Sequence, residues 1–198
     1  DLEISLTASG SGDGIKAIID GTANLAMSSR EMKESELEKA KDKGVELKPV
    51  AIATDAILPI VNPANPVPGV TRAQLKAIYT GEISNWKELG GDDAPVVIVS
   101  RDSSSGTYEA WGELVLDKAR VTPKALLQAS SGAVLQFVSQ NKNAIGYDSF
   151  GYVNDSVKGL PVDGVAGDPE TIDSGKYPIT RKLWVIANEN PGADVAAF

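Results

Sequence analysis

The sequence of 198 residues contains no cysteine and no histidine. Without cysteine there is no thiol nucleophile and no disulfide framework. Without histidine there is no zinc finger and no Ser-His-Asp triad. Any chemistry must therefore rest on hydroxyls, carboxylates, lysine, arginine or backbone amides, and we expect neither a metal site nor a cofactor.

The sequence also lacks an excess of positive charge and long apolar runs. It has 19 Lys+Arg against 27 Asp+Glu, a formal net charge of -8, whereas a general nucleic-acid binder needs a basic surface. No stretch of about 18 consecutive apolar residues is present, so no segment is expected to span a bilayer. With 42% apolar and 23% charged residues, the chain has the composition of an ordinary globular protein with one large domain or two small lobes.

The apolar pattern alternates between strand and helix periods. Alternation at Leu2, Ile4 and Leu6 predicts a half-buried strand, and the spacing of Ile15, Ile18 and Ile19 predicts a helix face. The predicted strands are residues 2–6, 25–27, 96–99, 143–147 and 183–187, with two apolar runs in 45–61. Helices are predicted to begin after residues 14, 71 and 107. Two more are predicted over residues 31–43, which end before Gly44, and around residues 134–138. Residues 155–177 are expected to be loop with short strands. This alternation predicts α/β lobes with mainly parallel sheets.

Two loops share one design, in which small residues and hydroxyls lie where a strand leads into a helix. Residues 9–14 read Ser-Gly-Ser-Gly-Asp-Gly, and residues 100–107 read Ser-Arg-Asp-Ser-Ser-Ser-Gly-Thr. Free N–H groups and the positive end of the helix dipole would face one point in each loop, which favours an anion. Arg101 adds a planar fork of donors.

Each loop alone is more often a plain turn and cap, and Arg101 alone is more often part of a structural ion pair. Two such loops in one α/β chain favour an anion site. A P-loop motif and a Gly-x-Ser-x-Gly nucleophile elbow are both absent.

Four blocks carry a resemblance to a known family. They are residues 11–22, 27–30, 78–91 and 100–107, which together resemble the periplasmic phosphate-binding proteins of phosphate ABC transporters, in order along nearly the whole chain. The resemblance implies the two-lobed type II periplasmic-binding-protein fold, with mainly parallel sheets flanked by helices and a two-strand hinge. We expect residues 1–55 and 148–198 to form the first lobe and 56–147 the second.

The resemblance also implies a set of phosphate ligands. By matching position we expect them at Ser11, Gly12, Ser29, Asp55, Arg101, Ser105, Gly106 and Thr107. Ser29 stands where better-known members have an aspartate that accepts the proton of hydrogen phosphate. Asp55 is the candidate replacement, because a carboxylate repels fully ionised sulfate but accepts a proton from hydrogen phosphate. The alternative, a strand-end residue that caps a neighbouring backbone, has equal weight.

The function implied is that of an extracytoplasmic solute-binding protein, not an enzyme, that captures inorganic phosphate between its lobes and delivers it to an ABC permease. We expect a monomer, periplasmic or membrane-anchored outside the cell, without nucleic-acid partners. The alternatives are a binder or sensor of sulfate or molybdate and, with less weight, an enzyme on phosphorylated substrates with Ser105 or Thr107 as nucleophile.

Family members begin with one more strand and helix and end with a long helix. By resemblance, the chain starts at the second strand and residues 188–198 enter a helix. We expect those end segments, and a signal sequence, to lie outside this sequence.

Overall fold

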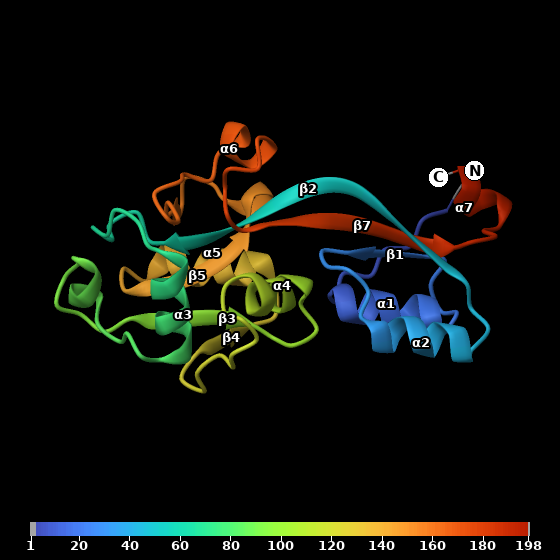
Figure 1. Cartoon of the computed structure of the whole chain (residues 1–198), viewed down its shortest axis with the longest axis horizontal. Coiled ribbons are helices and arrows are strands. Elements are labelled where there is room, and N and C mark those ends of the chain that lie inside the picture. Colours follow the sequence, from blue (N-terminus) through green and yellow to red (C-terminus); the bar gives the residue numbers. More distant parts are fainter. Residues whose placement is uncertain (1–2, 198) are drawn as a thin grey trace. The chain divides into compact units, whose positions relative to one another are not determined.

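The computed structural model describes residues 3–197 and divides the chain into two compact units. Unit 1 consists of Asp1–Ala53, Ser104–Gly106 and Lys182–Phe198, and unit 2 consists of Thr54–Ser103 and Thr107–Arg181. Two long strands, β2 (Leu47–Val61) and β7 (Thr180–Asn188), each contribute residues to both units (Figure 1). This use of two strands is the expected two-strand hinge connection.

Unit 1 is built from helices against a short strand. Its elements besides parts of β2 and β7 are α1 (Ser11–Ile19), β1 (Leu25–Ser28), α2 (Glu34–Asp42) and α7 (Ala193–Ala197). β1 pairs antiparallel with β7, with Ala26 opposite Ile186. These two side chains and Ile15 and Ile18 of α1 are buried together, because the apolar residues of α1 recur on one helix face.

Unit 2 holds the larger core around a mixed sheet. Its helices are α3 (Arg72–Thr80), η1 (Trp86–Leu89), α4 (Gly106–Leu114, which begins in unit 1), α5 (Ser131–Gln140), η2 (Phe150–Tyr152) and α6 (Pro169–Asp173). Its further strands are β3 (Val97–Arg101), β4 (Leu126–Gln128), β5 (Ala144–Ser149) and β6 (Lys158–Gly159). β3 is parallel to β4 and β5, whereas β2 is antiparallel to β5 and β6.

The α/β class is thus confirmed, and the sheet is mixed where the sequence predicted mainly parallel pairing. Apolar runs such as 96–99 report burial of a strand on both faces, and burial is the same for either strand direction. The direction is set by the connections, which the apolar pattern does not contain.

Most predicted elements are confirmed, including the helix start at Thr71. The Thr71 hydroxyl accepts from the Gln74 N–H, and the Gln74 side chain accepts from the Thr71 N–H. Gly44 follows the last residues of α2 with φ 69°, a conformation that suits glycine at a helix end.

The first predicted strand is wrong for its described residues. Leu2 lies outside the described residues, and Ile4 and Leu6 are in irregular chain with 66% and 70% of their surface exposed. An alternating segment becomes a strand only when a neighbouring strand pairs with it, and β1 stands at the end of the strand order. The buried strand predicted at 25–27 exists, but Met27 is exposed.

The expected lobe boundary after residue 147 also differs from the structure, because unit 2 continues to Arg181. β6 pairs with β2, and Ile172, Tyr177 and Ile179 are buried in the core of unit 2. These apolar contacts keep residues 148–181 with unit 2. The glycines and prolines in residues 155–177 favour loop structure, so the sequence pattern does not predict that this segment packs into the core of unit 2.

An aromatic cluster in unit 2 supports the end of β3. Trp111 and Tyr147 stack with ring centroids 4.4 Å apart, and Tyr79 meets both rings edge-on. The Tyr147 hydroxyl lies 2.9 Å from the Ser100 hydroxyl and accepts from the Arg101 N–H at 3.3 Å. The backbone of Arg101 is therefore fixed by the core.

Candidate functional site

Two serines form the polar centre of unit 1. Ser11 is the first residue of α1 and is buried, and its Oγ accepts a hydrogen bond from the Ser29 N–H at 3.1 Å. The two hydroxyl oxygens lie 3.2 Å apart. The structure therefore brings together Ser11 and Ser29, two of the predicted ligands, at the positive end of a helix.

Residues Ser104–Gly106 of the second loop pack against this pair within unit 1. The Gly12 N–H donates to the Ser104 carbonyl at 3.1 Å, so this amide has a partner inside the protein. A Cβ atom on Gly106 would lie 2.5 Å from Ser29 Oγ and 2.8 Å from Ser11 Cβ, a distance that atoms do not tolerate. Any larger residue at position 106 would force the two serine side chains to move, and Ser105 beside it is buried.

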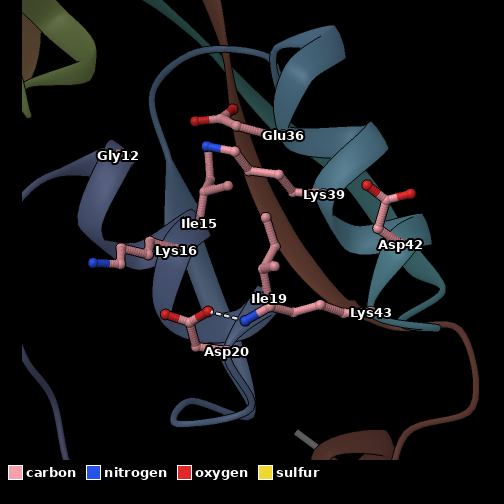
Figure 2. A pocket seen from close by; sticks show the side chains of 9 residues that line it. All are labelled: Gly12, Ile15, Lys16, Ile19, Asp20, Glu36, Lys39, Asp42 and Lys43. Atoms are coloured by element: carbon pink, nitrogen blue, oxygen red, sulfur yellow. Dashed lines mark hydrogen bonds and ion pairs between the residues drawn. The ribbon is translucent and has the colours of Figure 1, made fainter.

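A pocket of about 580 Å³ in unit 1 has neither serine among its lining residues, which Figure 2 shows. Its walls are two apolar side chains of α1 and charged residues of both signs on α1 and α2: Ile15, Lys16, Ile19, Asp20, Glu36, Lys39, Asp42 and Lys43, with Gly12 at one end. Among the predicted ligands only Gly12 lines it. The pocket is a charged groove between two helices and does not collect the predicted ligands.

In unit 2, Arg101 is buried at the end of β3 with its guanidinium held by neighbouring carbonyls. Nε donates to Gln128 O at 3.1 Å, Nη2 to Ala129 O at 3.3 Å and Nη1 to Ser131 Oγ at 3.2 Å. A guanidinium has five N–H donors, so two remain after these three bonds to the residues that the structure describes. Arg101 is therefore a positioned cation with spare donors, as an oxyanion site requires.

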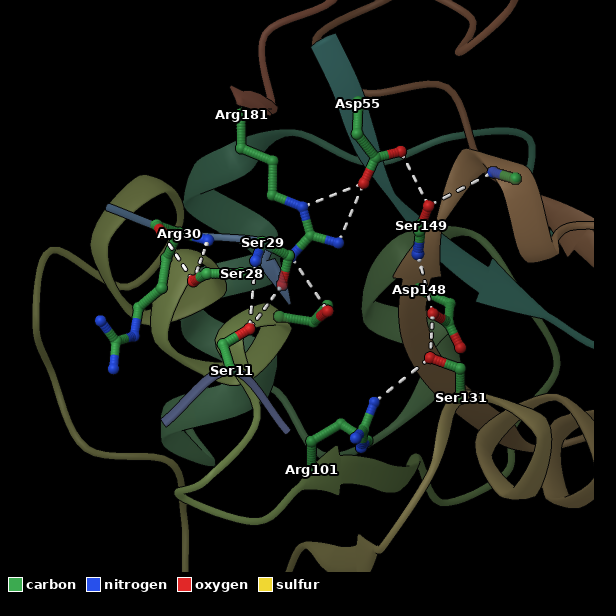
Figure 3. Close-up of polar contacts among 12 residues, drawn as sticks. Ser11, Ser28, Ser29, Arg30, Asp55, Arg101, Ser131, Asp148, Ser149 and Arg181 are labelled. Atoms are coloured by element: carbon green, nitrogen blue, oxygen red, sulfur yellow. Dashed lines mark hydrogen bonds and ion pairs between the residues drawn. The ribbon is translucent and has the colours of Figure 1, made fainter. Parts of the chain in front are cut away.

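Asp55 contacts a second buried arginine, Arg181 of β7 (Figure 3). Thr107 bonds the same arginine. Arg181 Nε and Nη2 each lie 2.9 Å from Asp55 Oδ2, and Nη1 donates to Thr107 Oγ1 at 2.9 Å. Asp55 Oδ1 accepts from the Ser149 hydroxyl at 2.7 Å. Burial lowers the pKa of Arg181, and the adjacent Asp55 carboxylate opposes that shift.

A second aspartate, Asp148 of β5, completes this group and is fully buried. Its Oδ1 accepts from the Ser131 hydroxyl at 2.7 Å and from the Ser149 N–H at 2.8 Å, while its Oδ2 is buried without a hydrogen-bond partner among the described residues. Burial raises the pKa of Asp148, opposed by these hydrogen bonds and by Arg101 and Arg181. The Ser131 hydroxyl connects Arg101 to Asp148 (Figure 3).

The structure thus gathers the predicted ligands into two groups, one in each unit. Ser11, Gly12, Ser29, Ser105 and Gly106 belong to unit 1, and Asp55, Arg101 and Thr107 belong to unit 2. Sequence reasoning missed Arg181, Asp148, Ser131 and Ser149. Nothing in the local sequence distinguishes Arg181 from Lys182 beside it, because its importance comes from Asp55, 126 positions away.

The two-unit α/β fold with its polar loops is that of a solute-binding protein. A family model described as a PBP superfamily domain matches residues 1–198, and the chain belongs to this superfamily. Within it, the chain belongs to the family that contains the phosphate-binding proteins PstS. It is 33% identical over 199 residues to the PstS of Borreliella burgdorferi, covering 95% of this chain and 69% of that relative.

Further relatives agree with this assignment. The chain is 35% identical to PstS of Pseudomonas aeruginosa over 96% of this chain and 65% of the relative. It matches a crystal structure from Clostridium perfringens, described as a phosphate ABC transporter substrate-binding protein with bound phosphate, with 41% identity, a TM-score of 0.87, and coverage of 96% of this chain and 76% of that one. The chain spans about two thirds of the length of these two PstS relatives.

Membrane-spanning helices and metal-binding clusters were both sought among the described residues. Among residues 3–197, no helix is long and apolar enough to cross a membrane. Within the same range, no group of acidic side chains could hold a metal ion.

Proposed function

We propose that this chain binds inorganic phosphate and serves as the solute-binding component of a phosphate ABC importer. One observation carries the proposal: all eight predicted ligands are buried or half-buried, in a chain 41% identical to a protein described with bound phosphate. Buried hydroxyls and a buried guanidinium replace the hydration shell of an anion without any net positive charge on the protein.

The proposed ligands are those named from the sequence. Ser11, Ser29, Ser105 and Thr107 supply hydroxyls, Gly106 supplies a backbone N–H at the start of α4, and Arg101 supplies its two spare N–H donors. Asp55 supplies an acceptor for the phosphate proton. Gly12 contributes close approach of its backbone, since its N–H already bonds Ser104.

The partners and the location follow from the relatives' descriptions as part of this proposal. We propose that the protein acts outside the cytoplasmic membrane as a monomer, delivers phosphate to the permease subunits of an ABC transporter, and carries out no catalysis. A micromolar dissociation constant, about -8 kcal/mol, suits such a role.

The first test is calorimetric titration of the purified chain with inorganic phosphate. Ser11→Ala removes one hydroxyl and leaves the helix intact, and hydrogen bonds to charged groups contribute about 1.5–3 kcal/mol. We therefore expect Ser11→Ala to weaken phosphate binding by about tenfold to a hundredfold. Ser156→Ala, an exposed serine outside both loops, is the control and should bind like the wild type.

Absence of phosphate binding by the wild-type chain would contradict the proposed function. Tighter binding of sulfate or molybdate in competition titrations would establish the alternative oxyanion binder. Hydrolysis of a chromogenic phosphate ester above background, lost in Ser105→Ala, would establish the enzyme alternative.

A further inference from the structure

Arg181 is a buried charge that the predicted ligand set does not include. Only 6% of its side chain and 8% of that of Asp55 are exposed. Taking both charges out of water costs several kcal/mol per ion, and replacing such a pair by apolar residues is often neutral or stabilising. Stability alone therefore does not explain why an arginine occupies this position.

The contact with Thr107 gives Arg181 a specific role. A hydroxyl has one hydrogen to donate, and the Thr107 oxygen already accepts from Arg181 Nη1. Among the residues that the structure describes, the Thr107 hydroxyl has no acceptor for that hydrogen. Arg181 thus leaves Thr107 as a directed donor in the first turn of α4.

The same guanidinium fixes Asp55 as an acceptor. Asp55 accepts the Nε–H of Arg181 on Oδ2 and the Ser149 hydroxyl on Oδ1, and Arg181 Nη2 lies 2.9 Å from the same Oδ2 as an ion-pair partner. A carboxylate offers about four lone-pair sites, so these bonds leave acceptor capacity on Asp55. Arg181 therefore orients the Thr107 hydroxyl as a donor and the Asp55 carboxylate as an acceptor.

We propose that Arg181 is the positioning residue that selects a protonated tetrahedral oxyanion, by orienting Thr107 as a donor and Asp55 as an acceptor. Hydrogen phosphate matches this pair, because its unprotonated oxygens can accept from Thr107 and its one hydroxyl can donate to Asp55. Sulfate has no proton to donate and would face the Asp55 carboxylate. This inference rests on the proposed function and extends it to a residue that does not itself have to touch the anion.

The test is calorimetry with inorganic phosphate and sulfate on a set of variants. Arg181→Lys keeps the charge but places all its donors on one nitrogen, so it does not reproduce the fixed planar fork that reaches Asp55 and Thr107 from separate nitrogens. We expect it to weaken phosphate binding about tenfold and to reduce the preference over sulfate. Thr107→Val should weaken phosphate binding by a similar factor, and Thr107→Ser should recover most of the loss.

The double variant separates positioning from a general loss of structure. If Arg181 acts through Thr107, the second substitution should add little to the first. The double variant with Arg181→Lys and Thr107→Val should then have a phosphate dissociation constant within about threefold of that of the weaker-binding single variant. Independent effects would multiply to about a hundredfold. Arg72→Lys, which alters an exposed ion pair with Asp163, is the control and should change neither affinity.

Every result of these titrations either supports or contradicts the inference about Arg181. If Arg181→Lys does not fold, Arg181→Gln is measured instead, and a weaker binding of phosphate and a smaller preference over sulfate are expected. Unchanged affinities in whichever variant is measured, or multiplying effects, would overturn the inference while the wild type still binds phosphate. A wild type that binds no phosphate would overturn the proposed function and this inference with it.

Discussion

Asp148 shows how one residue combines structural and electrostatic roles. One carboxylate oxygen is satisfied by Ser131 and Ser149, and the other is buried without a partner among the described residues. A buried charge with an unused oxygen is destabilising unless nearby cations compensate, and Arg101 and Arg181 do so in part. The ionised form of Asp148 is thus tolerated rather than favoured.

The raised pKa of Asp148 predicts a pH dependence of stability. An acid whose pKa is higher in the folded state stabilises the protein below its ordinary value of 3.8, and this stabilisation is lost as pH rises through the folded-state pKa. We expect the free energy of unfolding of the wild type to fall relative to Asp148→Asn as pH rises from about 3.8 towards neutrality. Urea unfolding of both proteins across this range measures it, and a difference that grows in favour of the wild type would contradict the assignment.

At this scale the sequence predicts the residues whose chemistry is local. Ser11, Arg101 and Thr107 could be named because hydroxyls and an arginine beside a helix start have a recognisable meaning. Arg181 and Asp148 could not, because they gain their roles from contacts with Thr107, Asp55 and Ser131 that only the tertiary structure creates.

At the scale of elements, α4 offers two glycines in contrasting surroundings. A methyl group on Gly106 would collide with Ser11 and Ser29, whereas one on Gly112 would meet nothing within 4 Å. Both lie in the same helix, so they share the intrinsic preference of a helix for alanine over glycine.

This contrast predicts opposite effects of one substitution. Gly112→Ala should stabilise the protein by about 0.4–1 kcal/mol without changing phosphate affinity. Gly106→Ala should destabilise it by about 1–3 kcal/mol and weaken phosphate binding, because Ser11 and Ser29 have to move. Thermal unfolding and calorimetry measure both, and wild-type behaviour of Gly106→Ala would show that the serines yield freely.

Elements with local start and stop signals were predictable, and elements that depend on a partner were not. The capping pair Thr71 and Gln74 fixes the start of α3 from sequence alone. Alternation at Ile4 and Leu6 has the period of a strand, yet pairing needs a neighbour that the pattern cannot supply.

At the scale of the whole molecule, the two units differ in the size of their cores. The core of unit 1 is a small group around α1, β1 and β7, whereas that of unit 2 contains the aromatic cluster and three or more strands. Apolar side chains of unit 1 such as Met27 and Ile52 are each 61% exposed. Less apolar burial gives lower local stability.

Hydrogen exchange should therefore be faster in unit 1. We expect amides of α1 and β1 to exchange faster than those of β5 and α5, as measured by mass spectrometry on peptides. Phosphate at a hundred times its dissociation constant should slow the exchange of α1. The free energy of opening should rise by up to about 2.7 kcal/mol. Equal exchange rates in α1 and β5 without phosphate would contradict this order.

The stack of Trp111 on Tyr147 has a practical consequence. The tyrosine hydroxyl bonds the main chain of Arg101, so an indole ring is connected to the guanidinium-bearing strand through one side chain. A change in the environment of that strand can alter the emission of the ring. If an anion binds at Arg101 as proposed, we expect the emission of Trp111 to change, so that binding could be followed without a label.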